Sequence, residues 1–301
     1  MFARTCQASS LRPGHSVSHA GSAELKLLSW NILAQRWADM CYEEGKYPLA
    51  SSSDIAWETR FPRILAELEA SGADVIALQE VGPNEFNEFL RPRLFAAGYQ
   101  GLRRRDAHRP FPSSATFWKA SRLRLESAKQ HGRDLVAVLR DRRVGASVAV
   151  VNVHLQGDPQ ASLKRLQQLK SALRGAATAG APHASLIVAG DFNEPPEQSA
   201  AAYLAFGSVP PGTREVPAEV FSVPAHGYQL ESVYGVDDPC DAFSFAPQGR
   251  LAWYGVLDHI WYDTRALRCV GRRPFFASEA VRLDLLRLGM PSAAAPSDHL
   301  P

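Results

Sequence analysis

The sequence predicts a single α/β domain, and two observations carry that prediction. Apolar, strand-like runs alternate with segments that have helical apolar spacing, which is the pattern of the α/β class. No stretch rich in Pro, Gly and Ser separates two independent apolar regions, so we expect residues 24–301 to form one domain. The length of 301 residues and the ordinary apolar and charged fractions agree with a globular protein of this kind.

The apolar patterns locate the individual elements. Strands are expected at residues 25–30, 74–79, 99–102, 114–119, 135–139, 146–155, 185–189 and 256–262. Helices are expected at residues 57–70, 85–95, 162–176 and 277–288. Pro62 would delay the start of the first helix, and Pro92 would shorten the second. Residues 32–56 are expected to be an exposed loop or insertion, and residues 207–227 a loop.

Residues 1–23 contain no acidic side chain and many Ser, Ala and Gly residues. This composition suits either an organelle transit peptide or a disordered leader. We therefore expect the protein in the cytoplasm, or in an organelle if the leader is a transit peptide. The four cysteines are scattered, which agrees with a reducing compartment. No apolar run approaches the length of a membrane span, so no membrane partner is expected.

The formal net charge of +2 excludes a protein that holds nucleic acid through its overall charge. A nucleic-acid site would have to be local. Basic clusters occur at residues 103–105, 140–143 and 272–273. Each could be a solvated surface or could face phosphate groups.

The stretch Val188–Pro196 combines the end of a strand-like run with two polar residues. A short apolar run ends at Gly190, and Asp191 and Asn193 follow it. In extended backbone, two residues separated by one would point to the same side. Taken alone, this stretch is equally an Asx-type turn that closes a strand.

Other polar residues stand close to predicted strands, most of them at strand ends. Together with the pair above they occupy six places: Asn31, Glu80, His154, Asp191 with Asn193, Asp258, and Asp298 with His299. Each alone would be a solvated or structural residue. If the strands lie side by side, we expect these side chains to form one acidic edge with two histidines.

That set of side chains suits metal-assisted phosphoryl chemistry. Glu80 and Asp298 are hard oxygen donors of the kind that Mg²⁺ requires, with Mn²⁺ as an alternative. Asn31 would add a neutral ligand or orient one of the carboxylates.

The remaining residues would carry the proton transfers. Asp191 would take the proton from an attacking water, and Asn193 would fix the water or the phosphate. Asp258 would hold the tautomer of His299, which would then donate to a phosphoryl oxygen. His154 would donate to another oxygen or to the leaving group.

Seven segments in this order resemble a known family. They are Ser29-Trp-Asn-Ile-Leu-Ala34, Leu78-Gln-Glu-Val81, Ala115-Thr-Phe-Trp-Lys119, Asn152-Val-His-Leu155, Gly190-Asp-Phe-Asn193, Leu257-Asp-His-Ile-Trp-Tyr262 and Pro296-Ser-Asp-His-Leu-Pro301. They resemble the endonuclease/exonuclease/phosphatase superfamily, and within it the deadenylase-like branch of nocturnin, Angel and 2′-phosphodiesterase proteins. The resemblance covers residues 25–301.

The resemblance implies a four-layer α/β sandwich, with two β-sheets face to face and helices outside. It also implies that Glu80 is the principal magnesium ligand, that Asp191 and Asn193 are a catalytic pair, and that Asp258 and His299 are coupled.

Two departures from the family pattern stand out. Family members continue past the Ser-Asp-His motif into a further core strand, whereas this chain ends two residues after His299. We therefore expect a domain that lacks its last strand or finishes the sheet differently, with some fraying at His299. The sequence also has no leucine-rich-repeat docking segment, so membership of a larger deadenylation complex is not inferred.

The leading functional hypothesis is a Mg²⁺-dependent phosphodiesterase that acts on RNA, as a 3′–5′ exoribonuclease with an adenosine preference. The alternatives are a phosphatase for an adenine-containing small molecule and a non-catalytic RNA-binding relative. Pro159 follows His154 by five residues, and Trp253 precedes Asp258 by five. The resemblance implies that these two side chains sandwich the terminal adenine; otherwise they would pack under the sheet and cap a loop.

Overall fold

The computed structural model describes residues 24–105, 111–179, 184–211, 213, 218–234, 242–248 and 254–301. The predicted leader, residues 1–23, and the predicted base-stacking residue Trp253 lie outside this set.

Ten strands carry the described part of the chain. They are β1 (Leu27–Asn31), β2 (Val75–Val81), β3 (Tyr99–Arg103), β4 (Ser113–Lys119), β5 (Leu123–His131), β6 (Asp134–Asp141), β7 (Ser147–His154), β8 (Ser185–Asp191), β9 (Leu230–Ser232) and β10 (Asp258–Asp263). The helical elements are α1 (Gln35–Glu43), α2 (Ser52–Ile55), α3 (Trp57–Ser71), η1 (Glu85–Leu90), α4 (Arg91–Ala96), α5 (Ser162–Thr178), α6 (Ser199–Phe206), η2 (Ala218–Ser222) and α7 (Glu279–Leu288).

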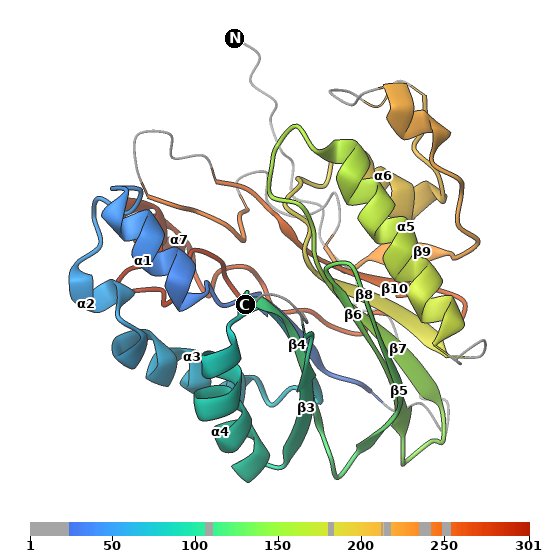
Figure 1. The fold of residues 1–301 in the computed structure, drawn as a ribbon, viewed down its shortest axis with the longest axis horizontal. Helices are drawn as coiled ribbons and strands as arrows, with labels where there is room; N and C mark the ends of the chain where they lie inside the picture. Colours follow the sequence, from blue (N-terminus) through green and yellow to red (C-terminus); the bar gives the residue numbers. More distant parts are fainter. Residues whose placement is uncertain are drawn as a thin grey trace.

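The strands form two sheets that face each other, and helices cover the outer faces (Figure 1). The first sheet has four strands in the order β1-β2-β4-β3, and the second has six in the order β5-β6-β7-β8-β10-β9. In Figure 1, α3 and α4 lie outside the first sheet and α5 and α6 lie outside the second. This arrangement confirms the predicted four-layer α/β sandwich.

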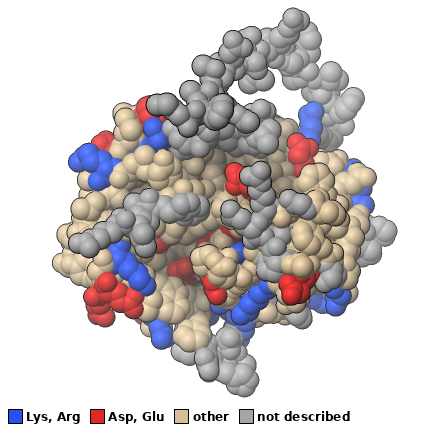
Figure 2. Space-filling model, turned by 90° about the horizontal axis from the view of Figure 1, so that it is seen from above, with Lys and Arg blue, Asp and Glu red and all other residues tan. Residues whose placement is uncertain are grey.

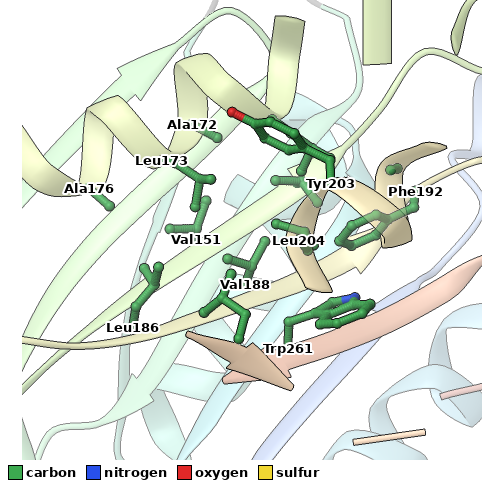
Figure 3. Close-up of a cluster of buried hydrophobic side chains, with 14 of the residues drawn as sticks. Val151, Ala172, Leu173, Ala176, Leu186, Val188, Phe192, Tyr203, Leu204 and Trp261 are labelled. Carbon is green, nitrogen blue, oxygen red and sulfur yellow. The ribbon is translucent and has the colours of Figure 1, made fainter. Parts of the chain in front are cut away.

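Three buried apolar clusters hold the layers together. Between the sheets, Val75 and Trp118 of the first sheet pack with Val150 and Ile187 of the second. Ile64 and Leu68 attach α3 to the outer face of the first sheet. The largest cluster joins α5 and α6 to the second sheet; its side chains are drawn in Figure 3. Because apolar burial is the main favourable term in folding, these layers form a rigid frame for the side chains at the strand ends.

The sequence prediction was wrong in several local places. Residues 32–56 are not a loop throughout, because α1 and α2 lie within them. The sequence pattern also missed β5, α6 and the short helical turn η2 within the predicted loop 207–227. Pro62 does not delay α3, which begins at Trp57 and contains the proline. Pro92 does not end the helical segment, because it lies in the first turn of α4, where a missing N–H is tolerated.

Among the described residues, none of the helices combines the length and the apolar character needed to cross a bilayer.

Candidate active site

Three neighbouring strands place His154, Asp191 and Asp258 in one row. The parallel pairing of β7 and β8 sets His154 beside Asp191, and the antiparallel pairing of β8 and β10 sets Asp258 beside Asp191. Asp258 is the first residue of β10, whereas Asp191 is the last residue of β8. Because the two strands are antiparallel, the start of β10 lies beside the end of β8. A slip of one residue would turn each side chain to the other face, so the register itself assembles the row.

Glu80 reaches the same place from the first sheet through an irregular backbone. The pairing of β2 with β4 shifts between Leu78 and Val81, and Glu80 within this bulge has φ +58°. Left-handed backbone is uncommon for a residue with a side chain, and bulges often redirect side chains next to active sites. Glu80 Oε2 accepts a hydrogen bond of 2.9 Å from the backbone N–H of Ala34.

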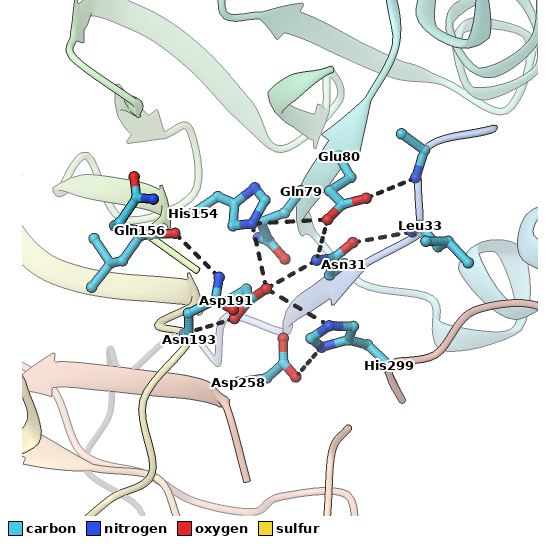
Figure 4. Close-up of polar contacts among 12 residues, drawn as sticks. Asn31, Leu33, Gln79, Glu80, His154, Gln156, Asp191, Asn193, Asp258 and His299 are labelled. Carbon is cyan, nitrogen blue, oxygen red and sulfur yellow. Dashed lines mark hydrogen bonds and ion pairs between the residues drawn. The ribbon is translucent and has the colours of Figure 1, made fainter. Parts of the chain in front are cut away.

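Asn31, at the end of β1, joins the two sheets at the site (Figure 4). Its Nδ2 donates to Glu80 Oε1 at 3.2 Å and to Asp191 Oδ2 at 3.0 Å. Its Oδ1 accepts from the backbone N–H of Leu33 at 3.0 Å. Of the two roles expected for Asn31, these contacts favour orienting the carboxylates, since its oxygen already has a backbone partner.

Asp191 is the centre of the polar group, with an exposed fraction of 1%. Its Oδ2 lies 3.5 Å from His154 Nε2 and 3.7 Å from His299 Nε2. The backbone N–H of Asn193 donates to Oδ1 at 2.8 Å. The expected extended alternation is wrong here, because Asn193 has φ +51° and closes an Asx-type turn. The Asx-type turn is therefore present, and it fixes the Asp191 carboxylate.

Asp258 and His299 form a directly bonded pair. Asp258 Oδ2 lies 2.8 Å from His299 Nδ1. The same oxygen accepts a hydrogen bond of 2.6 Å from the hydroxyl of Ser244. Burial acts to lower the pKa of His299, but the carboxylates of Asp258 and Asp191 outweigh it and raise the pKa to about 10. Both carboxylates therefore favour the protonated ring, in which Nδ1 donates to Asp258 and Nε2 faces Asp191.

His299 is firmly held, and the expected fraying is not seen. Its carbonyl accepts a hydrogen bond of 2.9 Å from Trp30 Nε1. Its ring lies 4.8 Å from the ring of Phe245, and only 5% of the residue is exposed. The next residue continues the attachment, because the N–H of Leu300 donates to the carbonyl of Ser244 at 2.7 Å.

Asp298, predicted as a metal ligand, has a different set of contacts. Its Oδ2 accepts a hydrogen bond of 2.9 Å from the hydroxyl of Tyr47, and Oδ1 lies 3.5 Å from Ser297 Oγ. Burial, followed by the charge of Asp298, raises the pKa of Tyr47, so the phenol remains a donor. These contacts favour a role in holding the segment before His299. No contact described in the structure brings Asp298 to Glu80.

The buried guanidinium of Arg60 holds the segment before His299 in place. Arg60 of α3 donates to the carbonyls of Ile32, Leu33 and Pro296 at 2.5 to 2.6 Å. Burial lowers the pKa of Arg60 to about 10, and the charge of Asp298 opposes that shift. The guanidinium thereby ties the residues after Asn31 to those before His299.

Two side-chain bridges were not expected from the sequence. Gln79 Nε2 donates to Asn152 Oδ1 at 2.8 Å and links the first sheet to the second. Each amide precedes a site residue, Glu80 or His154, by one or two positions. Arg165 and Glu194 form a buried ion pair at 2.8 Å, and Arg165 also donates to the carbonyl of Pro159 at 3.1 Å. Only tertiary structure brings these partners together, so neither bridge has a local signal in the sequence.

Of the two predicted stacking residues, the structure describes Pro159 but not Trp253. Pro159 is exposed in the loop between β7 and α5. This loop begins directly after His154. Because Trp253 lies outside the described residues, the sandwich remains a prediction.

The donor set fits a hard divalent cation. Asp191, Asp258 and His299 each offer an atom within 4.8 Å of the others. Asp258 already binds His299 Nδ1 at 2.8 Å, however, and this contact favours His299 as a hydrogen-bond donor over a metal ligand. The Glu80 carboxylate, only partly buried, offers the oxygen chemistry that magnesium or manganese prefers.

Comparison with known proteins identifies the family. Residues 28–299 match the Endonuclease/Exonuclease/phosphatase family. The chain belongs to this family. The match spans every site residue described above and confirms the resemblance seen in the sequence.

Relatives of this endonuclease/exonuclease/phosphatase protein include CCR4-Not complex 3′-5′-exoribonuclease subunits Ccr4. The one from Mycosarcoma maydis is 25% identical over 94% of this chain and 50% of its own length. The one from Schizosaccharomyces pombe is 22% identical over 91% of this chain and 48% of its own length. The chain thus spans about half the length of these relatives.

Solved structures of the same family share the fold. ANGEL2, described as a 2′,3′-cyclic phosphatase, superposes with a TM-score of 0.73 at 22% identity, covering 92% of this chain and 93% of ANGEL2. The human Nocturnin catalytic domain superposes with a TM-score of 0.57 at 22% identity, covering 92% of this chain and 91% of the Nocturnin chain. ANGEL2 and Nocturnin thus share the fold, and the similarity to the Ccr4 subunits supports the deadenylase-like branch of the family.

Proposed function

We propose that this protein is a Mg²⁺-dependent phosphodiesterase that hydrolyses RNA as a 3′–5′ exoribonuclease with an adenosine preference. The observation that carries the proposal is the position of Asp191, whose Oδ2 lies within 3.7 Å of Asn31, His154 and His299. The similarity to exoribonuclease subunits Ccr4 supports RNA as the substrate. The alternative activities considered above are separated from this one by the products that they release.

In this proposal Asp191 accepts the proton of the attacking water. The Asn193 N–H fixes Oδ1 at 2.8 Å and Asn31 fixes Oδ2 at 3.0 Å, so the carboxylate is held before substrate binds. Such preorganisation lowers the barrier because no reorientation is needed during the reaction.

The two histidines meet the charge that develops on the phosphoryl group. In the protonated ring of His299, Asp258 holds Nδ1–H, so Nε2–H is directed toward Asp191 and the substrate beside it. His154 Nε2 lies on the other side of Asp191 and would donate to a second oxygen or to the leaving group. Fixed donors of this kind typically contribute 10²–10³-fold, roughly, to turnover.

Glu80 would hold the magnesium ion, and Asn31 would orient the Glu80 carboxylate toward it. When bound, the ion supplies charge neutralisation for the phosphate and polarises its oxygens. Manganese has the same ligand preferences and is the alternative ion.

Stacking of the terminal base is proposed at the loop after His154; because stacking does not read base edges, the adenosine preference itself rests on the resemblance to the deadenylase-like branch. Pro159 is exposed at the edge of the site, where an apolar ring could cover one face of the terminal base. Trp253 is proposed as its partner from its spacing to Asp258 in the sequence.

The test uses purified protein with Mg²⁺ and end-labelled oligo(A), oligo(U), 2′-5′ oligoadenylate, a dinucleotide phosphate and an oligonucleotide that ends in a 2′,3′-cyclic phosphate. We expect stepwise release of nucleoside monophosphate from the 3′ end, fastest on oligo(A). Release of inorganic phosphate alone, or opening of the cyclic phosphate without chain shortening, would overturn the exoribonuclease proposal.

A further inference from the structure

An aromatic pair with a cation against it lies beside the site but takes no part in the chemistry above. The rings of Trp37 and Phe111 are nearly parallel, with an interplanar angle of 26° and centroids 6.3 Å apart. The guanidinium of Arg36 lies 5.4 Å from the Trp37 centroid and 5.0 Å from the Phe111 centroid. Both aromatic residues are half-buried and Arg36 is exposed, so the group reaches solvent.

Short contacts connect both aromatic residues to Glu80. Trp37 lies in the first turn of α1, which starts directly after Ala34, and the N–H of Ala34 donates to the Glu80 carboxylate. On the other side, Arg103 donates to the carbonyl of Val81 at 2.8 Å and to that of Phe111 at 2.5 Å. The pair is therefore built onto the same bulge that directs Glu80 into the site.

The surroundings of the pair are basic. Arg104 is the middle residue of the basic cluster 103–105, and Arg133 lies in the turn between β5 and β6. Partial loss of hydration and the charge of Arg104 lower the pKa of Arg133, whereas Glu80 acts in the opposite direction. Arg133 therefore lies within electrostatic reach of Arg104 and of Glu80. Figure 2 shows one face of the molecule, with acidic side chains in a recessed region and Lys and Arg side chains around it.

We propose that Trp37 and Phe111 form a stacking platform for a base of the RNA strand that lies upstream of the scissile linkage, beyond the two nucleotides that flank it. Arg36, Arg104 and Arg133 attract the phosphates of that part of the strand. The inference rests on the proposed function for the polarity of the strand, but binding to the platform can be measured without hydrolysis.

Charge and position together identify the occupant. Single-stranded nucleic acid is bound by aromatic faces on which bases stack, next to cations that follow the backbone. The platform is on the α1 side of the site, whereas Pro159 precedes α5; Figure 1 shows these two helices on opposite flanks. The terminal base and the upstream strand would therefore leave the scissile phosphate in opposite directions.

Packing alone accounts for only part of Trp37. One side of this residue packs with Leu33, Ala38 and Tyr47 in a small apolar cluster. A core function explains that side, but it does not explain the exposed guanidinium over both rings or the basic residues nearby. Phe111 is outside that cluster, which makes it the better position for a test.

The first variants are Phe111→Leu, which keeps the apolar volume but removes the ring, and Phe111→Tyr, which keeps the ring. Phe206→Leu is the matched control, because Phe206 is 71% exposed at the end of α6, far along the chain from this site. Affinity for a labelled octanucleotide is measured by fluorescence anisotropy in an Asp191→Asn background, so that hydrolysis does not consume the ligand.

We expect Phe111→Leu to weaken octanucleotide binding about tenfold, which is within the range for loss of one stacked base, and Phe111→Tyr and Phe206→Leu to bind as the parent does. The loss should be similar for oligo(A) and oligo(U), since stacking does not read base edges. With an active parent, Phe111→Leu should raise KM for the octanucleotide and leave kcat/KM for a dinucleotide unchanged.

Arg36→Gln tests the cation separately, with Arg142→Gln as its control at the far end of β6. We expect Arg36→Gln to weaken binding by severalfold and to reduce its salt dependence, and the control to do neither. Trp37→Leu should weaken octanucleotide binding as Phe111→Leu does. If Trp37→Leu unfolds the protein because Trp37 also packs in the apolar cluster, the two Phe111 variants still test the platform.

Unchanged octanucleotide binding in Phe111→Leu would overturn the platform, and so would an equal loss on the dinucleotide. A parent that shortens RNA while Phe111→Leu behaves identically would refute the platform and leave the proposed function standing. A parent that binds the octanucleotide through Phe111 but never shortens it would refute the proposed function alone.

Discussion

Replacing Asp134 by Asn should change how the stability of the protein depends on pH. Asp134, the first residue of β6, has an exposed fraction of 1%, and its Oδ1 has no hydrogen-bond partner among the described residues. Burial raises the pKa of Asp134 to about 8, although Arg104 and Arg133 act to lower it. The folded protein therefore prefers the neutral acid.

The sign and size of the effect follow from this preference. An unfolded Asp has a pKa of about 3.9, and one pKa unit corresponds to about 1.4 kcal/mol. Asp134 contributes stability that is fully present below the unfolded pKa and is lost as pH rises through the folded pKa of about 8. Between about pH 5 and about pH 8, the free energy of unfolding of the wild type should fall by roughly 4 kcal/mol relative to that of Asp134→Asn, because the amide of the variant stays neutral. That is a large part of the stability of an ordinary domain.

Urea unfolding at several pH values, followed by circular dichroism, measures the difference. The matched control is Asp141→Asn at the other end of β6. Burial acts to raise the pKa of Asp141, but the N–H of Arg143 and the charge of Arg122 outweigh it and lower that pKa. The stability from Asp141 is thus present above the unfolded pKa and is lost as pH falls, which is the opposite trend. Parallel curves for wild type and Asp134→Asn would show that Asp134 is charged in the folded protein and would refute the reasoning.

The remaining predictions concern activity. Glu80→Gln should abolish most Mg²⁺-dependent hydrolysis because the predicted metal ligand is lost; full turnover in excess chelator would contradict this. Asp191→Asn and His299→Ala should each reduce kcat about 10²-fold or more, with a smaller change in substrate affinity, as seen in single-turnover and binding assays. Near wild-type turnover of either would remove it from the mechanism. Trp253→Ala should raise KM for oligo(A) roughly tenfold and leave the melting temperature unchanged; a variant that unfolds would instead indicate a core residue.

The sequence predicted most strands and helices and the positions of the site residues because both depend on strong local patterns, whereas the four-layer arrangement was implied by the resemblance to a known family. Buried strands appear as apolar runs, and the site residues follow or begin those runs, as with Glu80, His154 and Asp191. The missed elements have weaker patterns. Strand β5 lies at an edge of its sheet and alternates with charged residues, and α1 buries only Ala38 fully. Tertiary contacts stabilise such elements, and a local pattern cannot show them.

The finer details missed at the site have the same origin. The left-handed backbone of Glu80 arises from a register shift between β2 and β4, which no single segment encodes. The role of Asp298 as a metal ligand stays a prediction. Its hydrogen bond with Tyr47, 251 positions away in the chain, is a tertiary contact that the motif around His299 does not show.

The in-register row of His154, Asp191 and Asp258 also bears on how such a protein can change. Neighbouring strands are about 4.8 Å apart, so the spacing within the row is a property of the sheet and not of any loop. Loops such as the one that carries Pro159 can then lengthen, shorten or change composition without moving the reacting groups. A lineage could acquire a new substrate by altering loops alone and keep its reaction chemistry intact. This division separates the loops, which can change without moving the reacting groups, from the strand ends, which cannot.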